Sequence, residues 1–177
     1  LVRRMEALIA ACVEVGDAAH PRVSTTRAET LVARACAALS PRWGRRGVPP
    51  HVSVEAAPMV IADADQIVNC LRIVLDNAID AGGEGASVVI RIFRRPNGAQ
   101  SRWDEAVIEI EDHGSGIRPA DLPRIFEPFF TTKEGALGLG LSVAQGLVIR
   151  NRGTLGVTSR PGRTIFRLGF PCPPEAA

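Results

Sequence analysis

Two glycine-rich clusters flank an aromatic segment in the second half of the chain. The first cluster is Asp112-His-Gly-Ser-Gly116, the second is Gly135-Ala-Leu-Gly-Leu-Gly140, and Ile125-Phe-Glu-Pro-Phe-Phe-Thr-Thr-Lys133 lies between them. Glycine lets a backbone approach a flat or phosphorylated ligand closely, because it has no Cβ. A lone pair of glycines most often marks a turn. The order and spacing of the two clusters instead predict a nucleotide pocket, with one cluster for the base and one for the phosphates.

The second cluster has the features of a phosphate site. Gly138 and Gly140 lead into an expected helix, whose free amides and positive end favour phosphate oxygens. Lys133, which follows Thr131 and Thr132, is a candidate cation for the same phosphates. Two plainer alternatives stay open at this point: a helix start that only needs tight packing, and a lysine that is only solvated.

Asp112 and Asn77 supply two further groups that a nucleotide site needs. Asp112 ends an expected strand, and its carboxylate can accept a hydrogen bond from the exocyclic amine of adenine. Asn77 lies within an expected long helix and offers a neutral carbonyl oxygen, a ligand type that suits Mg²⁺. The alternatives are an aspartate that only opens a turn, and an asparagine that points to solvent or is held by a hydrogen bond.

Expected helices and strands are interleaved along the chain around these groups. Apolar residues at helical spacing predict helices over residues 2–15, 31–39, 63–81 and 139–150, and the spacing of Thr26 and Glu29 predicts a capping box before the second helix. Alternating residues predict strands over 51–55, 59–61, 88–95, 106–111, 155–160 and 164–170, with 59–61 pairing beside 51–55 and residues 43–50 forming a loop. This pattern favours a two-layer α/β sandwich, in which helices cover one face of a mixed, mostly antiparallel sheet.

Composition narrows the class of protein further. The 177 residues, 46% hydrophobic and 23% charged with a net charge of +2, are typical of one folded soluble domain and indicate neither a nucleic-acid nor a membrane partner. The four cysteines are widely spaced, which argues against a zinc site or a disulfide framework and favours reduced thiols in the cytoplasm. The apolar stretch 7–13 is too short for a membrane span. The beginning at Leu1-Val-Arg-Arg4 suggests a piece of a longer chain.

Four segments together resemble the catalytic ATP-binding domain of bacterial sensor histidine kinases. They are Asp76-Asn-Ala-Ile-Asp-Ala81, Asp112-His-Gly-Ser-Gly-Ile117, Ile125–Lys133 and the glycine-rich segment that ends at Ser142, and they occur in the family's order within residues 23–171. The resemblance implies a Bergerat fold, the ATP-binding fold of the superfamily of gyrase, Hsp90, histidine kinases and MutL. It also implies binding of Mg²⁺-ATP and transfer of the γ-phosphoryl group to a histidine.

The resemblance implies a role for each matched residue. Asn77 would hold Mg²⁺ and act as the catalytic residue, Asp112 would bind the adenine amine, and Thr164 in the closing strand would help to seat the adenine. The full set of implied nucleotide contacts is Asn77, Asp80, Ala81, Asp112, Gly114, Gly116, Ile117, Phe130, Thr131, Thr132, Lys133, Gly138, Leu139, Gly140, Leu141 and Thr164.

The same resemblance implies a lid between Lys133 and Gly138. Phe126, Phe129 and Phe130 would pack this lid against the body of the domain and against partner helices. The lid is short, so we expect its ordering to depend on the ligand.

The chain departs from the family pattern at two points. Ile73 stands four residues before Asn77, where the kinases commonly have another asparagine and the gyrase, Hsp90 and MutL branch has a basic glutamate. An isoleucine cannot activate water, which argues against a hydrolytic ATPase. Because positioning and charge stabilisation dominate phosphoryl transfer, this loss need not abolish transfer. None of His20, His51 and His113 lies in a helical context typical of a phospho-acceptor, so we assign none of them that role.

These departures leave three functions open. The first is a histidine kinase catalytic domain, the second a nucleotide-binding regulatory module without transfer activity, and the third a related protein Ser/Thr kinase. We expect residues 1–20 to be the remnant of a dimerisation helix, 21–171 the catalytic domain and 172–177 a tail. The expected partners are the dimerisation and phospho-acceptor domain of the full-length chain, which would form a homodimer although this chain alone can be monomeric, and a downstream response regulator.

Overall fold

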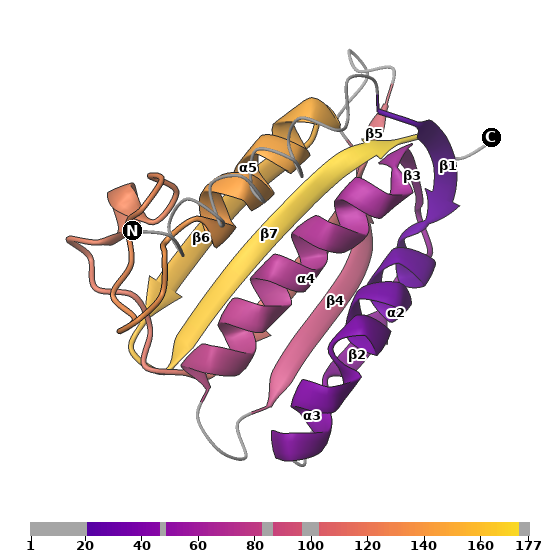
Figure 1. The fold of residues 1–177 in the computed structure, drawn as a ribbon. Coiled ribbons are helices and arrows are strands. Elements are labelled where there is room, and N and C mark those ends of the chain that lie inside the picture. The colour runs from indigo at the N-terminus through magenta and orange to yellow at the C-terminus, as the bar shows by residue number, and fades with distance from the viewer. Residues whose placement is uncertain (1–20, 47–48, 83–86, 97–102, 174–177) are drawn as a thin grey trace.

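One five-stranded sheet forms a layer of the molecule (Figure 1). The computed structural model describes residues 21–46, 49–82, 87–96 and 103–173. The sheet order is β2 (His51–Val54), β4 (Val88–Arg95), β5 (Asp104–Asp112), β7 (Arg163–Cys172) and β6 (Thr154–Arg160). Strand β2 runs parallel to β4, and all other neighbours in this sheet are antiparallel.

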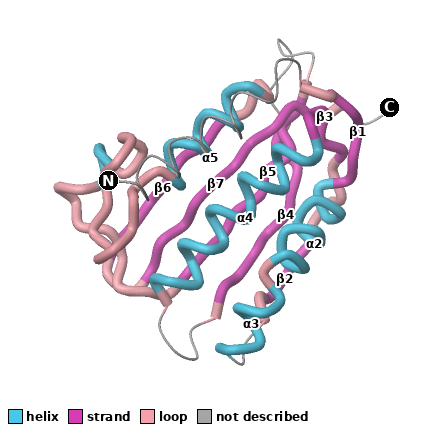
Figure 2. Tube along the Cα trace, in the orientation of Figure 1, coloured by secondary structure: helices cyan, strands magenta, loops and turns pink. Residues whose placement is uncertain are grey.

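Three helices form the second layer. Helices α2 (Ala28–Ala38), α4 (Ala64–Ala81) and α5 (Gly140–Arg150) lie on one face of the sheet, with α4 in the middle (Figure 2). Strand residues alternate between the two faces of a sheet, and Ile90, Ile92, Ile108 and Ile110 point into the core beneath these helices. The expected two-layer sandwich with a mixed, mostly antiparallel sheet is confirmed.

Helix α4 carries Asn77 and is the central helix of the fold. Its first turn is capped by Asp63, whose side chain accepts hydrogen bonds from the backbone amides of Asp65 and Gln66. The helix then buries a continuous apolar stripe that includes Leu71 and Val74 and ends at the cap residue Gly82. The expectation for residues 63–81 is confirmed to within one residue.

A buried polar contact fixes α5 relative to α4. Asn151, which follows α5, accepts a hydrogen bond from the Asp63 amide at 2.8 Å and donates to Gln66 Oε1 at 2.9 Å. Asn151 also donates to the carbonyl of Leu147 at 2.8 Å. Because this contact joins the end of α5 to the start of α4, it sets where the other end of α5 meets the site.

The expected pairing of residues 59–61 is wrong. Strand β3 (Met59–Asp63) pairs antiparallel with β1 (Val23–Arg27) in a separate two-stranded sheet, and not beside β2. Strand β1 was not expected, and Thr26 lies in it, with Val60 as its partner. The expected capping box at Thr26 is therefore also wrong, since α2 begins after Arg27 and has no side-chain cap.

A short helix replaces part of the loop expected over residues 43–50. Helix α3 (Ser40–Arg46) begins with Ser-Pro, and proline is well tolerated in a first helical turn. Trp43 is buried against the core and holds the helix in place. This helix brings Arg42 next to α4, which matters for the site.

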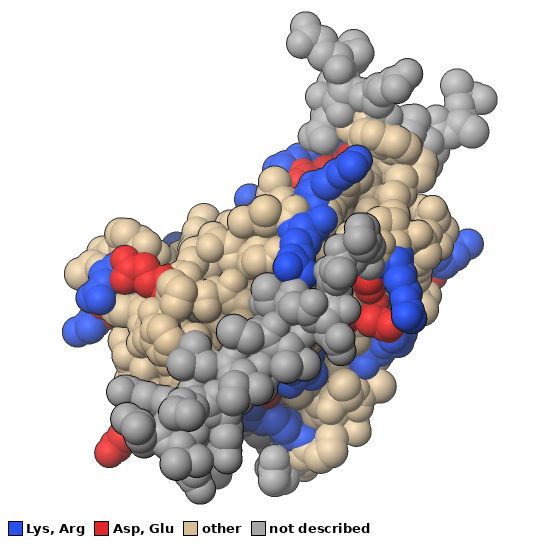
Figure 3. All heavy atoms as spheres, turned by 45° about the horizontal axis from the view of Figure 1, so that its top comes forward, with Lys and Arg blue, Asp and Glu red and all other residues tan. Residues whose placement is uncertain are grey.

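The helix expected over residues 2–15, and with it the dimerisation remnant expected at 1–20, lies outside the described residues. Among the residues that are described, no helix is long and apolar enough to cross a membrane. On the face drawn in Figure 3, basic and acidic residues occur close together at several places, in keeping with the small net charge.

Candidate nucleotide-binding site

A cavity of about 950 Å³ opens between α4, the segment that follows β5, the start of α5 and β7. Its volume lies at the upper end of the range of small-molecule sites, roughly 300–1,000 Å³. Of the contacts expected from the sequence, the cavity wall contains Asn77, Asp80, Ala81, Asp112, Gly116, Ile117, Phe130, Thr131, Thr132, Lys133, Gly138, Leu139, Gly140, Leu141 and Thr164. The fold thus brings residues from four separate segments to one place.

Gly114 is the one expected contact that is not part of this wall. A Cβ at this position would overlap the backbone carbonyl of Ala81. Glycine is therefore required here by the close approach of the loop to the end of α4. Its effect on a ligand would be indirect, through the position of that loop.

Asp112 and Thr164 line the end of the cavity where the sequence predicts the base, which we call the base end. Asp112 is 2% exposed and pairs in register with Thr164, which is 3% exposed. One carboxylate oxygen of Asp112 accepts a hydrogen bond from the Gly114 amide at 3.0 Å. Burial raises the pKa of Asp112, and the hydrogen bond from Gly114 partly opposes this. The site therefore holds a partly desolvated carboxylate, a strong acceptor for an amine.

Ser159 lies directly beside this end, although no sequence motif singles it out. Its hydroxyl lies 2.9 Å from the Thr164 hydroxyl and accepts a hydrogen bond from the Ile117 amide at 2.8 Å. Ser159 and Thr164 are direct partners across the hairpin of β6 and β7. The strand pairing alone, once the hairpin at Pro161-Gly162 is recognised, places these two hydroxyls together.

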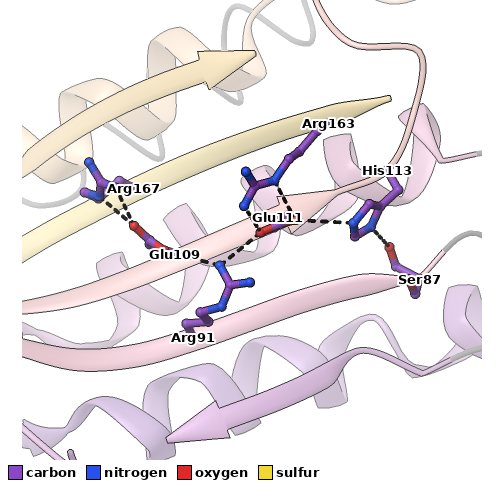
Figure 4. Close-up of polar contacts among 7 residues, drawn as sticks. All are labelled: Ser87, Arg91, Glu109, Glu111, His113, Arg163 and Arg167. Carbon is purple, nitrogen blue, oxygen red and sulfur yellow. Dashed lines mark hydrogen bonds and ion pairs between the residues drawn. The ribbon is translucent and has the colours of Figure 1, made fainter. Parts of the chain in front are cut away.

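The residues on either side of Asp112 serve the opposite face of the sheet. Glu111 is 4% exposed and accepts hydrogen bonds from Arg163 at 2.8 and 3.0 Å and from Arg91 at 2.9 Å (Figure 4). The hydrogen bond from Arg163 lowers the pKa of Glu111 to about 2, against the effect of burial and with help from Arg91. His113 Nε2 lies 3.2 Å from Glu111. These contacts stabilise the end of β5 on the face of the sheet opposite the cavity.

The start of α5 lines the end of the cavity where the sequence predicts the phosphates, which we call the phosphate end. Leu139 precedes the helix and offers no side-chain cap to its first amides, so the positive end of the helix faces the cavity with backbone donors. Gly138 has a φ of +68°, and a Cβ there would come within 2.5 Å of the Phe130 carbonyl. Glycine is therefore required at position 138 by its positive φ and by the close approach of the Phe130 carbonyl.

Asn77 meets a cation in the phosphate end. Lys133 Nζ donates to Asn77 Oδ1 at 2.8 Å and to Asp80 Oδ2 at 2.8 Å. The other oxygen of Asp80 bonds Arg42 from α3, and Arg42 also bonds Asp76. Burial opposes ionisation of Asp80, but the hydrogen bonds from Lys133 and Arg42 outweigh it and lower the Asp80 pKa. Sequence reasoning missed Arg42, since no local pattern joins it to α4.

The three phenylalanines of the aromatic segment differ in their packing. Phe126 and Phe130 are partly buried against the core, and the Arg124 guanidinium lies 4.5 Å from the Phe130 ring centre. Phe129 is 49% exposed and has a φ of +68°, a backbone conformation that is uncommon for such a residue. Phe126 and Phe130 therefore pack against the body, and the expected packing against partner helices stays a prediction.

Ile73 occupies the cavity wall where a polar residue would be expected. It is partly buried against the core, and a Cβ on Gly140 would lie 3.2 Å from its Cγ2 atom. The side chain thus fills the space between α4 and the start of α5 with apolar atoms.

The fold and this cavity define a nucleotide-binding α/β sandwich, and comparisons with known proteins give its family. A family profile described as histidine kinase-, DNA gyrase B-, and HSP90-like ATPase matches residues 62–174. The sensory histidine kinase/phosphatase NtrB of Rhodobacter capsulatus is 30% identical over 181 residues, which cover 98% of this chain and 50% of NtrB. The chain belongs to this ATPase family, and within it is an ATP-binding catalytic domain of the sensor histidine kinase type.

Solved structures share the fold. The mycobacterial sensor histidine kinase MprB superposes with a TM-score of 0.70 at 26% identity, covering 86% of this chain and 99% of that one. Full-length ShkA in complex with AMPPNP gives a TM-score of 0.79 at 22% identity, covering 98% of this chain and 37% of ShkA. The chain spans about half the length of its NtrB relative.

Proposed function

We propose that this chain binds Mg²⁺-ATP and transfers the γ-phosphoryl group to a histidine on a dimerisation helix of its full-length protein. The observation that supports this most is the single cavity in which Asp112, Asn77 and the start of α5 meet. A carboxylate for the adenine amine, an amide oxygen for the metal and backbone donors for the phosphates are the groups that such a substrate needs.

The residues of the phosphate end fit a magnesium ion that is shared with the nucleotide. Mg²⁺ takes oxygen ligands and usually keeps waters and substrate phosphates in its shell. Asn77 Oδ1 is such a ligand, and it already binds a cation, the Lys133 ammonium. When bound, the metal would supply positive charge that neutralises the phosphates. The base end involves none of these residues, so it would bind adenine without the metal.

Ile73 favours transfer over hydrolysis. Its side chain is apolar and packs between α4 and the start of α5, so it offers no base to a water molecule. Phosphoryl transfer depends mainly on positioning and charge. These are the contributions of Lys133, the α5 amides and Asn77.

The acceptor and the partners belong to the proposed whole protein. Neither histidine of the described segments lies on a helix, because His51 begins β2 and His113 follows β5. The proposal therefore includes an acceptor histidine on a separate dimerisation domain, a homodimeric parent, a response regulator that receives the phosphoryl group, and a cytoplasmic location. The division into residues 1–20, 21–171 and 172–177 remains a prediction.

A transfer assay tests this function. The chain is incubated with γ-labelled ATP, Mg²⁺ and a separately supplied dimerisation domain, and acid-labile phosphohistidine is followed. The control is the same dimerisation domain with its acceptor histidine replaced by glutamine. We expect label on the first domain and none on the second.

Two other outcomes would favour other functions. Absence of label, under conditions where calorimetry shows that ATP binds, would contradict transfer and favour a regulatory nucleotide-binding module. Ile73 and the lack of an assigned phospho-acceptor histidine motivate this alternative. An acid-stable phosphoester on a protein partner would instead indicate a Ser/Thr kinase.

A further inference from the structure

Lys133 is the only lysine in the chain, whereas the other 20 of the 21 basic residues are arginines. The two cations differ in shape. An arginine presents a planar fork of donors, whereas a lysine ammonium is a compact point charge on a flexible stem. An ammonium can therefore sit on a single oxygen atom in much the way that a metal ion does. The ammonium of Lys133 thus lies at the oxygen where the metal ion is proposed to bind.

The contacts of Lys133 place its charge against helix α4. Its ammonium is 2.8 Å from both Asn77 Oδ1 and Asp80 Oδ2. Its backbone amide is held at 3.0 Å by the Thr131 hydroxyl. The side chain thus reaches back from the loop onto α4 and binds two residues that are one helical turn apart.

Asp80 is itself held in place. Arg42 bonds the second oxygen of Asp80 and also bonds Asp76, so that two aspartates on α4 share one guanidinium. The Arg42 side chain is 29% exposed, against 41% for Lys133. A firmly held carboxylate therefore stands beside Asn77, and it fixes the position of the more exposed lysine.

A lysine ammonium and a metal ion on Asn77 Oδ1 would oppose each other. A magnesium ion on this oxygen would lie at about 2.1 Å from it. Since the ammonium nitrogen lies 2.8 Å from the same atom, the two cations would be within roughly 5 Å of each other and would repel. Binding of either cation to this oxygen is therefore expected to weaken binding of the other.

We propose that Asp80 is a positioning residue that holds the Lys133 ammonium on Asn77 Oδ1, so that metal and lysine compete for this oxygen. The inference rests on the proposed function, because it takes Asn77 as the metal ligand. After leaving Asn77, Lys133 remains tethered to Asp80 and can reach the phosphates. Loop position and metal binding are then linked through one atom.

The first test needs no nucleotide. In protein labelled with ¹⁵N-lysine, Lys133 gives the one lysine side-chain resonance and the one lysine amide resonance of the 177-residue chain. We expect the side-chain resonance of the wild type to differ from that of a free lysine, and to move to the free position in Asp80→Asn. The control is Asp65→Asn, which removes an exposed carboxylate of α4 that pairs with Arg34, and it should leave the resonance in place. A resonance that Asp80→Asn does not move would overturn the proposal.

The second test measures the competition. ADP is used because it has no γ-phosphate for the lysine to bind, and the Mg²⁺ dependence of its binding is followed by calorimetry. Losing one exposed contact should lower the Mg²⁺ midpoint of Lys133→Met about fivefold. Arg34→Gln controls for general charge, since this arginine pairs with Asp65 and is not part of the cavity wall, and it should shift the midpoint by less than about twofold.

The outcomes separate this inference from the proposed function. A midpoint that is unchanged or raised in Lys133→Met would contradict the competition, even where ADP binds normally. Failure of ADP to bind the wild type under any condition would contradict the proposed function. The comparison of the ligand-free proteins would then still decide whether Asp80 holds Lys133.

Discussion

The two ends of the cavity are built in different ways. At the base end, Asp112 and Thr164 face each other across two paired strands and are almost fully buried. At the phosphate end, Lys133 and Asp80 are 41% and 33% exposed and meet through an ion pair between a loop and a helix. Strand register therefore sets the base end before a ligand arrives, whereas the phosphate end consists of charges that can change partners.

The largest effect is expected at the base end. Asp112→Asn removes the charge that would accept the adenine amine, and losing such a hydrogen bond costs about 1.5–3 kcal/mol of binding free energy. Because the base end is independent of the metal, calorimetric titration with the adenine nucleotide should show the same loss of binding free energy in Mg²⁺ and in EDTA. Asp65→Asn, in the first turn of α4, is the matched control. A loss confined to one of the two conditions would break the distinction between the ends.

The strained loop beside the phosphate end should be sensitive to a single methyl group. Gly138 and Gly135 both have a positive φ, but only at Gly138 would a Cβ strike other atoms. Gly138→Ala should therefore lower the free energy of unfolding by about 2 kcal/mol, and Gly135→Ala by about 1 kcal/mol. Urea unfolding of both variants measures the difference. Equal losses would mean that the contact with Phe130 is not tight.

At the phosphate end, the expected loss of nucleotide affinity depends on Mg²⁺. Asn77→Ala should weaken ADP binding by about 1.5 kcal/mol with Mg²⁺ present, and should leave binding in EDTA almost unchanged. The reason is that Asn77 would contact the nucleotide through the metal alone. Equal weakening in both conditions would show that Asn77 serves the base or the helix rather than a metal.

Low pH should weaken the ion pairs of Glu111, which lie on the face of the sheet opposite the base end. The folded state lowers the Glu111 pKa from 4.5 to about 2, so its ion pairs stabilise the fold above pH 4.5 and this contribution is lost as pH falls towards 2. Its arginine partners are 34% and 37% exposed, and solvent screening reduces the effect to on the order of 1 kcal/mol. Glu111→Gln should flatten the unfolding free energy over this pH range. Glu127→Gln, an exposed pair, should not.

The base end and the central helix were predictable because their signals are local. The 63–81 stripe is long and regular, and Asp63 begins it with a side-chain cap. Asp112 ends an alternating strand just before a glycine turn. In both cases the residues that define the element are neighbours in the sequence.

The phosphate end was only partly predictable because its contacts are distant in the sequence. Ser40-Pro-Arg-Trp43 has the composition of a loop, and its helix depends on burial of Trp43 by other elements. Arg42 lies 38 residues from Asp80 in the sequence, and no periodicity connects the two. The pairing of β1 with β3 was missed for the same reason, since tertiary packing decides such short strands.

Titration of the wild-type chain with ATP and with GTP, in the presence of Mg²⁺, tests the central claim most directly. The Asp112 carboxylate can accept a hydrogen bond from the adenine amine, but it would face the carbonyl oxygen of guanine. We predict one ATP site and at least about tenfold weaker binding of GTP. Equal affinity for the two nucleotides, or no binding of ATP, would contradict it.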